Sequence, residues 1–246
     1  MDGAVLCTQS SKTVGSLQGL SVVLPCYKEN PMIVATLYTE LTAQGAEVIV
    51  VDDGNSMDMP SNMPYISYPA HVGYGYAIKH GIKKASNPII CTADSDGQHQ
   101  IKDIVNLYSV YKTISDCKMV VGQRWNINEK PIRWIGRKCL NFLASLISSH
   151  YHPDLNSGLR VFDRDMAIGY SPILCDTFSF TTSLTMSVVT DGHKTCTIPI
   201  DVKPRISGKS HVRLAKDGLV TLYYIVWIGL ALRTRKLRAW LRNHIG

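Results

Sequence analysis

The sequence lacks the patterns that define several classes of protein. Its seven cysteines are scattered and include no C-x-x-C pair, which excludes ordinary zinc spacing and argues against a disulfide framework. The first sixteen residues lack the charged start and apolar run of a signal peptide. The longest apolar run, residues 218–232, has fifteen residues and is too short for an ordinary membrane span. These absences indicate a protein of the reducing cytosol.

Acidic residues are scarce in the C-terminal part of the chain. The chain has 26 Lys and Arg against 19 Asp and Glu, a net charge of +7. Between residues 205 and 242 it has nine basic residues and a single acidic one, Asp217. Such a surplus suits nucleic acid, anionic lipid or phosphorylated small molecules. Nucleic acid is disfavoured, because the aromatic residues of this region belong to an apolar run and do not alternate with basic residues on one surface.

What is present predicts an α/β protein. The 246 residues are 45% hydrophobic, enough for one large domain. Apolar β-branched runs alternate with helical patterns, which is typical of a mostly parallel sheet flanked by helices. The predicted strands are residues 20–25, 47–52, 65–68, 88–92, 118–122, 160–162 and 195–202. The predicted helices are residues 31–43, 74–85, 101–113, 132–148, 180–190 and 214–240.

The chain divides into three predicted parts. Residues 1–18 are expected to form a loose arm, residues 19–212 the α/β domain, and residues 213–246 a basic amphipathic helix. The apolar residues of 132–148, among them Trp134, Ile135, Leu143 and Ile147, recur at helical spacing and favour a helix packed in the core over membrane contact. The last helix, with its cations, fits either the surface of a membrane or a contact between subunits.

The segment Thr92-Ala-Asp94-Ser-Asp96-Gly-Gln98-His99 follows an apolar strand. Two carboxylates two residues apart can share a hard divalent cation, Mg²⁺ or Mn²⁺, and Gln98 can add a neutral oxygen. Such a cation offsets the charge of a departing diphosphate. The D-x-D pattern alone favours a solvated turn that precedes the next helix, because the pattern is common by chance.

Two further strand ends carry polar side chains. Asp52-Asp53-Gly54 can accept hydrogen bonds from a nucleobase or ribose, although Asp-Gly is also common in plain turns. Pro25-Cys-Tyr27-Lys-Glu29 could stack a base on Tyr27 and accept from its edge at Glu29. Neither motif is specific by itself.

In combination the motifs resemble one family. The order of Pro25-x-Tyr27-x-Glu29, Asp52-Asp53-Gly54, Gly73-Tyr-Gly75 and the Asp94–His99 segment is that of the family 2 glycosyltransferases with a GT-A fold. The later segments Val121-Gly-Gln-Arg124, Asn156-Ser-Gly-Leu-Arg160 and Pro204-Arg205-Ile-Ser-Gly208-Lys-Ser210 also fit. The match spans roughly residues 20–213, and the branch that it is most similar to is the dolichyl- and polyprenyl-phosphate mannosyl- and glucosyltransferases.

The resemblance implies a role for each matching position. The nucleotide-sugar would contact Pro25, Tyr27, Glu29, Asp53, Asp94 and Lys209; the metal, Mg²⁺ or Mn²⁺, would be held by Asp94, Asp96 and Gln98; and the catalytic residues would be Asp96, Arg124 and Arg205. The implied reaction is inverting transfer of a hexose from a GDP- or UDP-sugar, on the cytoplasmic face of the membrane, with peripheral attachment.

The sequence departs from the family at three places. His211 stands where the family has a lysine, with Lys209 two residues earlier, and Lys28 replaces the usual asparagine. The helix after Phe178 lacks the glutamate of many relatives, which leaves Asp154 as a possible base. A hydroxyl acceptor needs a base and an anionic phosphate does not, so this shortage favours a polyprenyl-phosphate acceptor over a saccharide hydroxyl. A sugar-1-phosphate nucleotidylyltransferase is disfavoured, because its G-G-x-G-T-R loop is absent after the first strand.

Overall fold

The computed structural model describes residues 5–6, 16–61, 63–125, 131–203 and 214–245. The strands are β1 (Val5–Leu6), β2 (Leu20–Cys26), β3 (Glu47–Asp52), β4 (Tyr65–Ser67), β5 (Ile89–Thr92), β6 (Cys117–Arg124), β7 (Arg160–Asp163) and β8 (Lys194–Ile200). The helices are α1 (Pro31–Ala43), α2 (Tyr74–Lys84), α3 (Ile101–Thr113), α4 (Pro131–Ser148), α5 (Arg164–Tyr170), the 3-10 helix η1 (Ser171–Ile173), α6 (Phe180–Thr190) and α7 (Leu214–Ile245).

The strands form one sheet in the order β1-β8-β6-β7-β5-β2-β3-β4. Only β7, among these strands of the described chain, runs against its neighbours, β5 and β6. The strands β2, β3, β5, β6 and β8 therefore all end at one edge of the sheet, and β7 begins there. This carboxyl edge is where open α/β sheets bind ligands.

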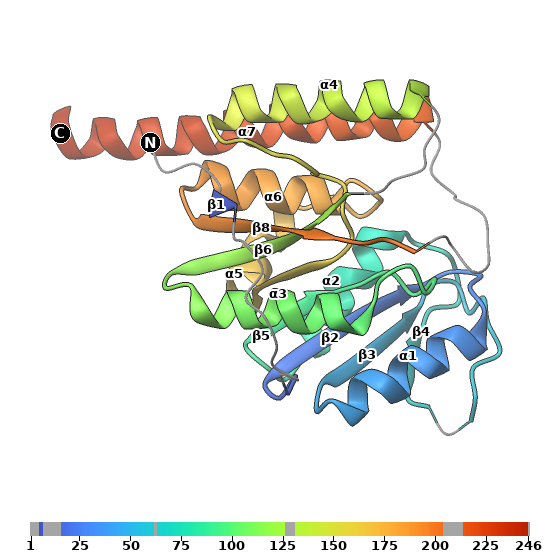
Figure 1. Cartoon of the computed structure of the whole chain (residues 1–246). Helices are drawn as coiled ribbons and strands as arrows, with labels where there is room; N and C mark the ends of the chain where they lie inside the picture. Colours follow the sequence, from blue (N-terminus) through green and yellow to red (C-terminus); the bar gives the residue numbers. More distant parts are fainter. Residues whose placement is uncertain (1–4, 7–15, 62, 126–130, 204–213, 246) are drawn as a thin grey trace.

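Helices cover both faces of the sheet (Figure 1). α1 and α3 pack on one face through Val34 and Leu107, and α2, α5 and α6 pack on the other through residues such as Ile78 and Leu184. α4 and α7 lie beyond α6 and share a smaller apolar cluster with it, which includes Ala144 and Ile225. The molecule therefore has an extra helical layer on one side only.

Local sequence explains where α1 begins and ends. Pro31 occupies its first turn, and the Asn30 side chain accepts a hydrogen bond from the Met32 amide at 2.9 Å. Gly45, with φ of 88°, lies just beyond the helix in the left-handed region that glycine tolerates. The chain then turns directly into β3, which ends at Asp52.

The prediction of an α/β protein with a mostly parallel sheet and a C-terminal helix is confirmed. Each predicted strand and helix is present, and all bounds except the end of α7 agree within two residues. The short helix α5 was not predicted, and it begins where the Asp163 side chain accepts from the Met166 amide at 2.8 Å. Seven residues are too few for a clear helical period.

Two expectations need correction. The predicted loose arm, residues 1–18, contains β1, which pairs with β8, and the fully buried Leu17. Trp134 and Ile135, expected in the core, are each 50% exposed, whereas Leu143 and Ile147 of the same predicted set pack against the cluster that α4 shares with α6 and α7. In the part of α7 whose side chains are described, apolar residues lie both in the core and on the surface. No helix in the described part of the chain combines the length and apolarity needed to cross a membrane.

Candidate active site

The loop after β5 presents two carboxylates at the carboxyl edge of the sheet. Asp94 accepts a hydrogen bond from the Tyr74 hydroxyl at 3.1 Å and lies 3.2 Å from His99 Nε2. Asp96 is buried, and its Oδ1 accepts from the Gln98 amide at 3.0 Å. Gly97, with φ of 78°, makes the turn between Asp96 and Gln98. The two predicted metal-binding carboxylates are thus on one short, tightly turned loop.

The partners of Asp94 keep it ionised. Burial alone would raise the pKa of Asp94, but the hydrogen bond and charge of His99, together with Tyr74 and Arg124, outweigh burial and lower it. Burial and then the charge of Asp94 raise the pKa of Tyr74 well above its usual value, so the phenol stays protonated and donates. An anionic oxygen cluster of this kind suits a hard divalent cation.

Gly158 lets the chain pass close to Asp94. A Cβ atom at this position would lie 2.5 Å from Asp94 Oδ1 and 2.7 Å from Oδ2, so any other residue here would force the Asp94 carboxylate or the chain to move. The Gly158 carbonyl accepts from Thr92 Oγ1 at 2.8 Å, which fixes the start of β7 against β5. Gly158 was part of a recognised motif, but its contact with Asp94 depends on the reversed direction of β7 and was not predicted.

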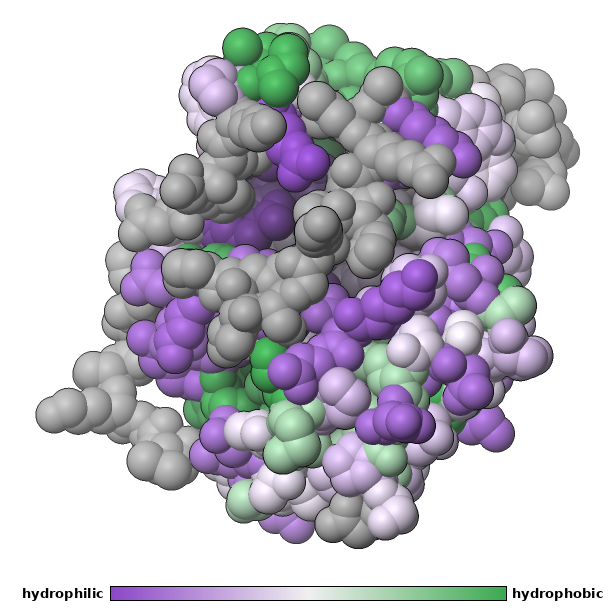
Figure 2. Space-filling model, turned by 90° about the vertical axis from the view of Figure 1, so that its right-hand side faces the viewer, coloured by the Kyte–Doolittle hydropathy of each residue, from purple (hydrophilic) through white to green (hydrophobic). Residues whose placement is uncertain are grey.

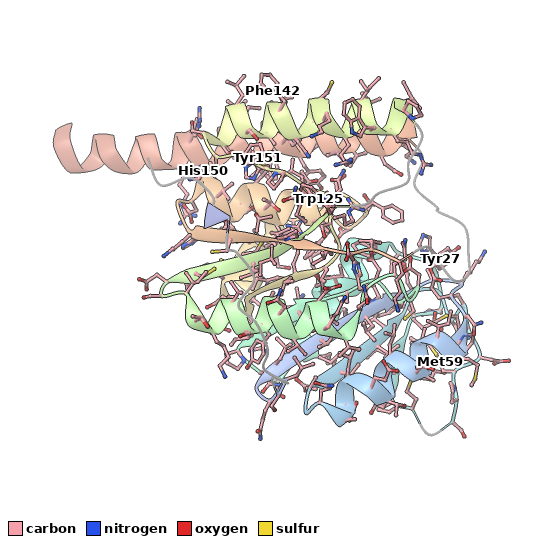
Figure 3. All side chains as sticks on the ribbon, in the orientation of Figure 1. Tyr27, Met59, Trp125, Phe142, His150 and Tyr151 are labelled. Carbon is pink, nitrogen blue, oxygen red and sulfur yellow. The ribbon has the colours of Figure 1, made fainter. Side chains whose placement is uncertain are left out.

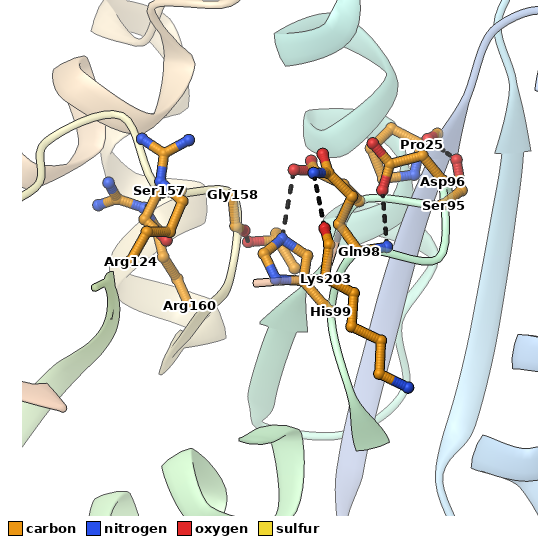
Figure 4. Close-up of polar contacts among 12 residues, drawn as sticks. Pro25, Ser95, Asp96, Gln98, His99, Arg124, Ser157, Gly158, Arg160 and Lys203 are labelled. Atoms are coloured by element: carbon orange, nitrogen blue, oxygen red, sulfur yellow. Dashed lines mark hydrogen bonds and ion pairs between the residues drawn. The ribbon is translucent and has the colours of Figure 1, made fainter. Parts of the chain in front are cut away.

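Hydrogen bonds join this loop to neighbouring strand ends (Figure 4). Ser95 Oγ donates to the Pro25 carbonyl at 2.8 Å, which ties the ends of β5 and β2 together. Gln98 and Lys203 exchange two bonds of 3.1 Å, from Gln98 Nε2 to the Lys203 carbonyl and from the Lys203 amide to the Gln98 carbonyl. The segment after β8 therefore holds both the side chain and the backbone of Gln98. The role of Gln98 as a metal ligand stays a prediction.

The Asp52–Asp53 pair after β3 is used differently. Asp52 Oδ1 accepts from the amide and hydroxyl of Ser56 at 3.1 and 2.7 Å. Asp53 accepts from the amides of Val72 and Gly73 at 2.7 and 2.8 Å and lies 2.7 Å from His71 Nδ1. Asp53 thus holds the loop that leads into α2. Its contact with a nucleoside stays a prediction, and Asp53 would have to make that contact while it keeps these bonds.

The predicted base-stacking residue has an aromatic partner. The Tyr27 ring stacks on His71 with centroids 4.0 Å apart and an interplanar angle of 24°. His71 is in turn held by Asp53. Glu29 lies two residues further along and is half-buried. Pro25, Tyr27, Glu29 and Asp53 therefore lie along the ends of β2 and β3, beside the Asp94 loop.

Arg124, at the end of β6, forms a bidentate pair with Asp154. The distances are 2.7 Å from Nε to Oδ2 and 2.8 Å from Nη2 to Oδ1. Burial would raise the pKa of Asp154, but the charge and hydrogen bonds of Arg124 outweigh it and lower that pKa. This pairing disfavours Asp154 as a general base, because a paired carboxylate of low pKa is a poor proton acceptor.

A second arginine, Arg160, is completely buried at the start of β7. It donates to the Ser157 carbonyl at 2.8 Å, to the Leu155 carbonyl at 2.5 Å, and to the Thr185 hydroxyl. Burial lowers its pKa to about 10, which leaves it charged at neutral pH. Arg160 therefore shapes the loop that carries Gly158, a structural role that a motif alone does not show.

An open groove lies on the far side of His99, between α1 and the start of α3. Its volume is about 550 Å³, and its walls include Ile33, Leu37, Lys102 and Lys203. The predicted phosphate-binding residues Arg205 and Lys209 lie outside the described residues. Their positions relative to Asp94 therefore stay predictions.

Comparison with known proteins agrees with this geometry. The model of the family "Glycosyl transferase family 2" matches residues 21–170, more than half of the chain. The protein therefore belongs to glycosyltransferase family 2, and it is a glycosyltransferase.

Two archaeal relatives are similar in sequence. An uncharacterized protein of Methanocaldococcus jannaschii is 33% identical over 160 residues, which cover 59% of this chain and 65% of that protein. The UDP-N-acetylglucosamine–dolichyl-phosphate N-acetylglucosaminyltransferase of Methanococcus voltae is 27% identical over 174 residues, which cover 58% of this chain and 68% of the enzyme. The chain thus matches just under two thirds of the first relative.

A solved structure shares the fold. Glucosyl-3-phosphoglycerate synthase from Mycobacterium tuberculosis, in complex with Mn²⁺, UDP and phosphoglyceric acid, superposes with a TM-score of 0.72 at 16% identity. The superposition covers 92% of this chain and 86% of the synthase. The architecture is accordingly that of the GT-A glycosyltransferases.

Proposed function

We propose that this protein is a divalent-metal-dependent, inverting glycosyltransferase that moves a hexose from a UDP-sugar to a polyprenyl phosphate. The observation that carries the proposal is the Asp94–Asp96 loop at the carboxyl edge, where Tyr74, His99 and Gly158 fix the position of Asp94. It lies beside the strand ends that carry Tyr27 and Glu29, the residues expected to hold the nucleoside.

The donor set fits a cation that is shared with the substrate. Within the described residues, no group of three His, Cys, Asp or Glu side chains is placed to hold a metal ion. Asp94 and Asp96 would hold Mg²⁺ or Mn²⁺, with Gln98 as a further oxygen donor, and diphosphate oxygens would complete the coordination. The bound cation would stabilise the negative charge of the nucleoside diphosphate as it leaves.

The residues near the acceptor side support a phosphate over a hydroxyl. α6 is buried along its whole length and its sequence, FTTSLTMSVVT, contributes no carboxylate. Asp154 is paired with Arg124 and has a lowered pKa. A phosphate oxygen needs no base before it attacks the anomeric carbon, whereas a sugar hydroxyl does. The saccharide-hydroxyl alternative would require a base from another part of the chain.

Names of similar proteins support both substrates. The Methanococcus voltae enzyme uses a UDP-sugar and dolichyl phosphate, and a relative from Yersinia pestis, 26% identical over 189 residues, is an undecaprenyl-phosphate 4-deoxy-4-formamido-L-arabinose transferase. The Mycobacterium tuberculosis synthase was solved with UDP. These names favour uridine over guanosine as the nucleoside of the donor.

The donor site is tested by protection against thermal unfolding. UDP with Mn²⁺ should raise the melting temperature in a concentration-dependent way, because it binds only the folded protein, and GDP should not. Asp96→Ala should abolish the protection, and Asp58→Ala, at an exposed aspartate away from the β5 loop, should keep it. Absence of protection by UDP in wild type would overturn the donor assignment.

The acceptor is tested by transfer from UDP-glucose and UDP-N-acetylglucosamine in detergent. Undecaprenyl phosphate should accept the sugar, and undecaprenol, which carries a hydroxyl in place of the phosphate, should not. Transfer to undecaprenol or to a soluble oligosaccharide at a comparable rate would contradict the phosphate acceptor. It would favour the saccharide alternative.

A further inference from the structure

α4 carries large apolar side chains on its outer side as well as on its packed side. On the packed side, buried Ala144 and partly buried Leu140, Leu143 and Ile147 belong to the cluster shared with α6 and α7. The opposite face carries Ile132, Ile135, Phe142 and Leu146, which are 61, 50, 72 and 65% exposed. Their spacing of three, seven and four residues places them in one stripe along the helix. An ordinary surface helix has polar residues on the side that faces away from the core.

α7 adds a second stripe. Leu219, Tyr223 and Leu230 are 67, 58 and 59% exposed, with Trp227 between them at 37%. The opposite side of α7 is buried against α4 and α6. The helices approach so closely that a Cβ at Gly229 would lie 2.2 Å from the Ile147 side chain.

These stripes form what we call the α4–α7 surface: Ile132, Ile135, Phe142, Leu146, Leu219, Tyr223, Trp227 and Leu230. Figure 2 shows hydrophobic residues along the top of the molecule, where Figure 1 places these two helices. Phe142 projects away from the body of the protein in Figure 3. Large exposed apolar patches of this kind mark sites of interaction.

The charges beside the α4–α7 surface are positive. Lys138 on α4 and Lys216, Arg233 and Arg235 on α7 are exposed. Lys138 lies 5.9 Å from the ring centre of Trp134. The sequences of the two helices contain one acid, Asp217. Apolar and aromatic residues bordered by Lys and Arg match the boundary between acyl chains and anionic headgroups.

The α4–α7 surface is also connected to the active site. α4 follows β6 by six residues and α7 follows β8 by thirteen, and both strands end at the edge that carries Asp94. The beginnings of both helices are therefore tethered to that edge.

We propose that the α4–α7 surface rests on a membrane with anionic lipids, with both helices parallel to the bilayer. This inference rests on the proposed function, because it explains how the enzyme reaches a polyprenyl phosphate that stays in the bilayer. A second copy of the chain fits the surface less well. In a two-fold contact the same cations would face each other across the interface with little compensating acid.

Vesicle flotation of the full chain tests the proposal. Wild type should float with phosphatidylcholine vesicles that contain about one third phosphatidylglycerol and much less with phosphatidylcholine alone, because the cations require anionic lipid. The double variant Phe142→Ser/Leu146→Ser should lower the partition coefficient by about tenfold or more. Met32→Ser, at a 68% exposed residue of α1 far from this surface, is the matched control and should float like wild type.

A second variant and two further measurements separate the outcomes. Leu219→Ser/Leu230→Ser should lower flotation as the α4 variant does, and both variants should keep the wild-type melting temperature. Flotation that is unchanged in both variants would overturn the membrane surface, and so would a wild-type dimer that both variants convert to monomers without vesicle binding. Transfer to undecaprenyl phosphate in detergent without flotation would refute the surface and leave the proposed function intact. Flotation without transfer would support the membrane surface and contradict the proposed function.

Discussion

Two acidic motifs lie at the same edge of the sheet, Asp52–Asp53 after β3 and Asp94–Asp96 after β5, and they have different partners. Asp53 accepts hydrogen bonds from two backbone amides, lies 2.7 Å from His71 Nδ1 and is almost fully buried. Asp94 accepts from side chains, Tyr74 and His99, and is 34% exposed. Backbone partners fix the path of the chain, whereas side-chain partners orient a carboxylate that stays partly open to solvent. The comparison teaches that a strand-end aspartate pair can be framework or site, according to its donors.

The largest effect is expected at Asp94. Asp94→Asn should slow metal-dependent transfer by about a thousandfold, or about 4 kcal/mol in the activation barrier, because the cation loses a charged ligand. The free energy of unfolding should change by less than about 1 kcal/mol, because the hydrogen bonds described for this carboxylate come from side chains. Steady-state kinetics and urea unfolding would measure the two quantities. Wild-type turnover in the Asp94 variant would contradict a role of Asp94 in the reaction.

Asp53→Asn should act mainly on stability. The amides of Val72 and Gly73 would then share a neutral acceptor, and the expected loss is about 2 kcal/mol in the free energy of unfolding. Urea unfolding should show a lower midpoint with an unchanged slope. Asp58→Asn, at an exposed aspartate nearby, should stay within about 0.5 kcal/mol of wild type. Equal stability of the two variants would mean that Asp53 is not part of the framework.

Gly158→Ala tests whether Asp94 needs the close approach of the chain. The added methyl group would push against both oxygens of Asp94, so we expect Mn²⁺ to bind about tenfold more weakly in the presence of UDP. Isothermal titration calorimetry measures this affinity. Gly169→Ala in α5, where a Cβ meets no atom within 4 Å, should leave the affinity unchanged. Identical affinities in the two variants would be evidence that Asp94 is free to move.

Tyr74→Phe should have the smallest effect. It removes the hydroxyl that donates to Asp94 and keeps the ring that stacks on Phe178 at 5.6 Å. The expected loss is about fivefold in kcat/KM, which corresponds to about 1 kcal/mol for one hydrogen bond. Tyr76→Phe, on the exposed side of the same helix, should match wild type. A larger loss in the Tyr74 variant than in the Asp94 variant would mean that the phenol, and not the carboxylate, is the more important group.

Much of the fold could be predicted because its signals are local. The strands β2, β3 and β5 are short apolar runs that end in polar residues, and α1 has both its proline start and its glycine end in the sequence. The Asp94–Asp96 loop was found for the same reason, because spacing and position after a strand are visible along the chain. Local patterns also predicted the extent of α4 correctly.

The parts that could not be predicted depend on contacts between distant residues. The pairing of Arg124 with Asp154, and the approach of Gly158 to Asp94, exist only after β7 has been placed between β5 and β6. The outward face of α4 was missed for a similar reason. Helical spacing shows that apolar residues share a face, but not whether that face meets the core or the surface.

The reversal of β7 has a consequence for how such a protein can be altered. β6 and β7 pair side by side, with Val121 opposite Arg160, so residues 125–159 form one long hairpin connection. The facing Cα atoms of Val121 and Arg160 are about 5 Å apart, whatever the length of chain between the two strands. Within this connection, α4 packs on α7 and α6, whereas Gly158 near its end contacts Asp94 and accepts from Thr92. The sequence of α4 can therefore change while the strands that carry Tyr27, Asp53 and Asp94 stay in place, but the segment around Gly158 has to be kept.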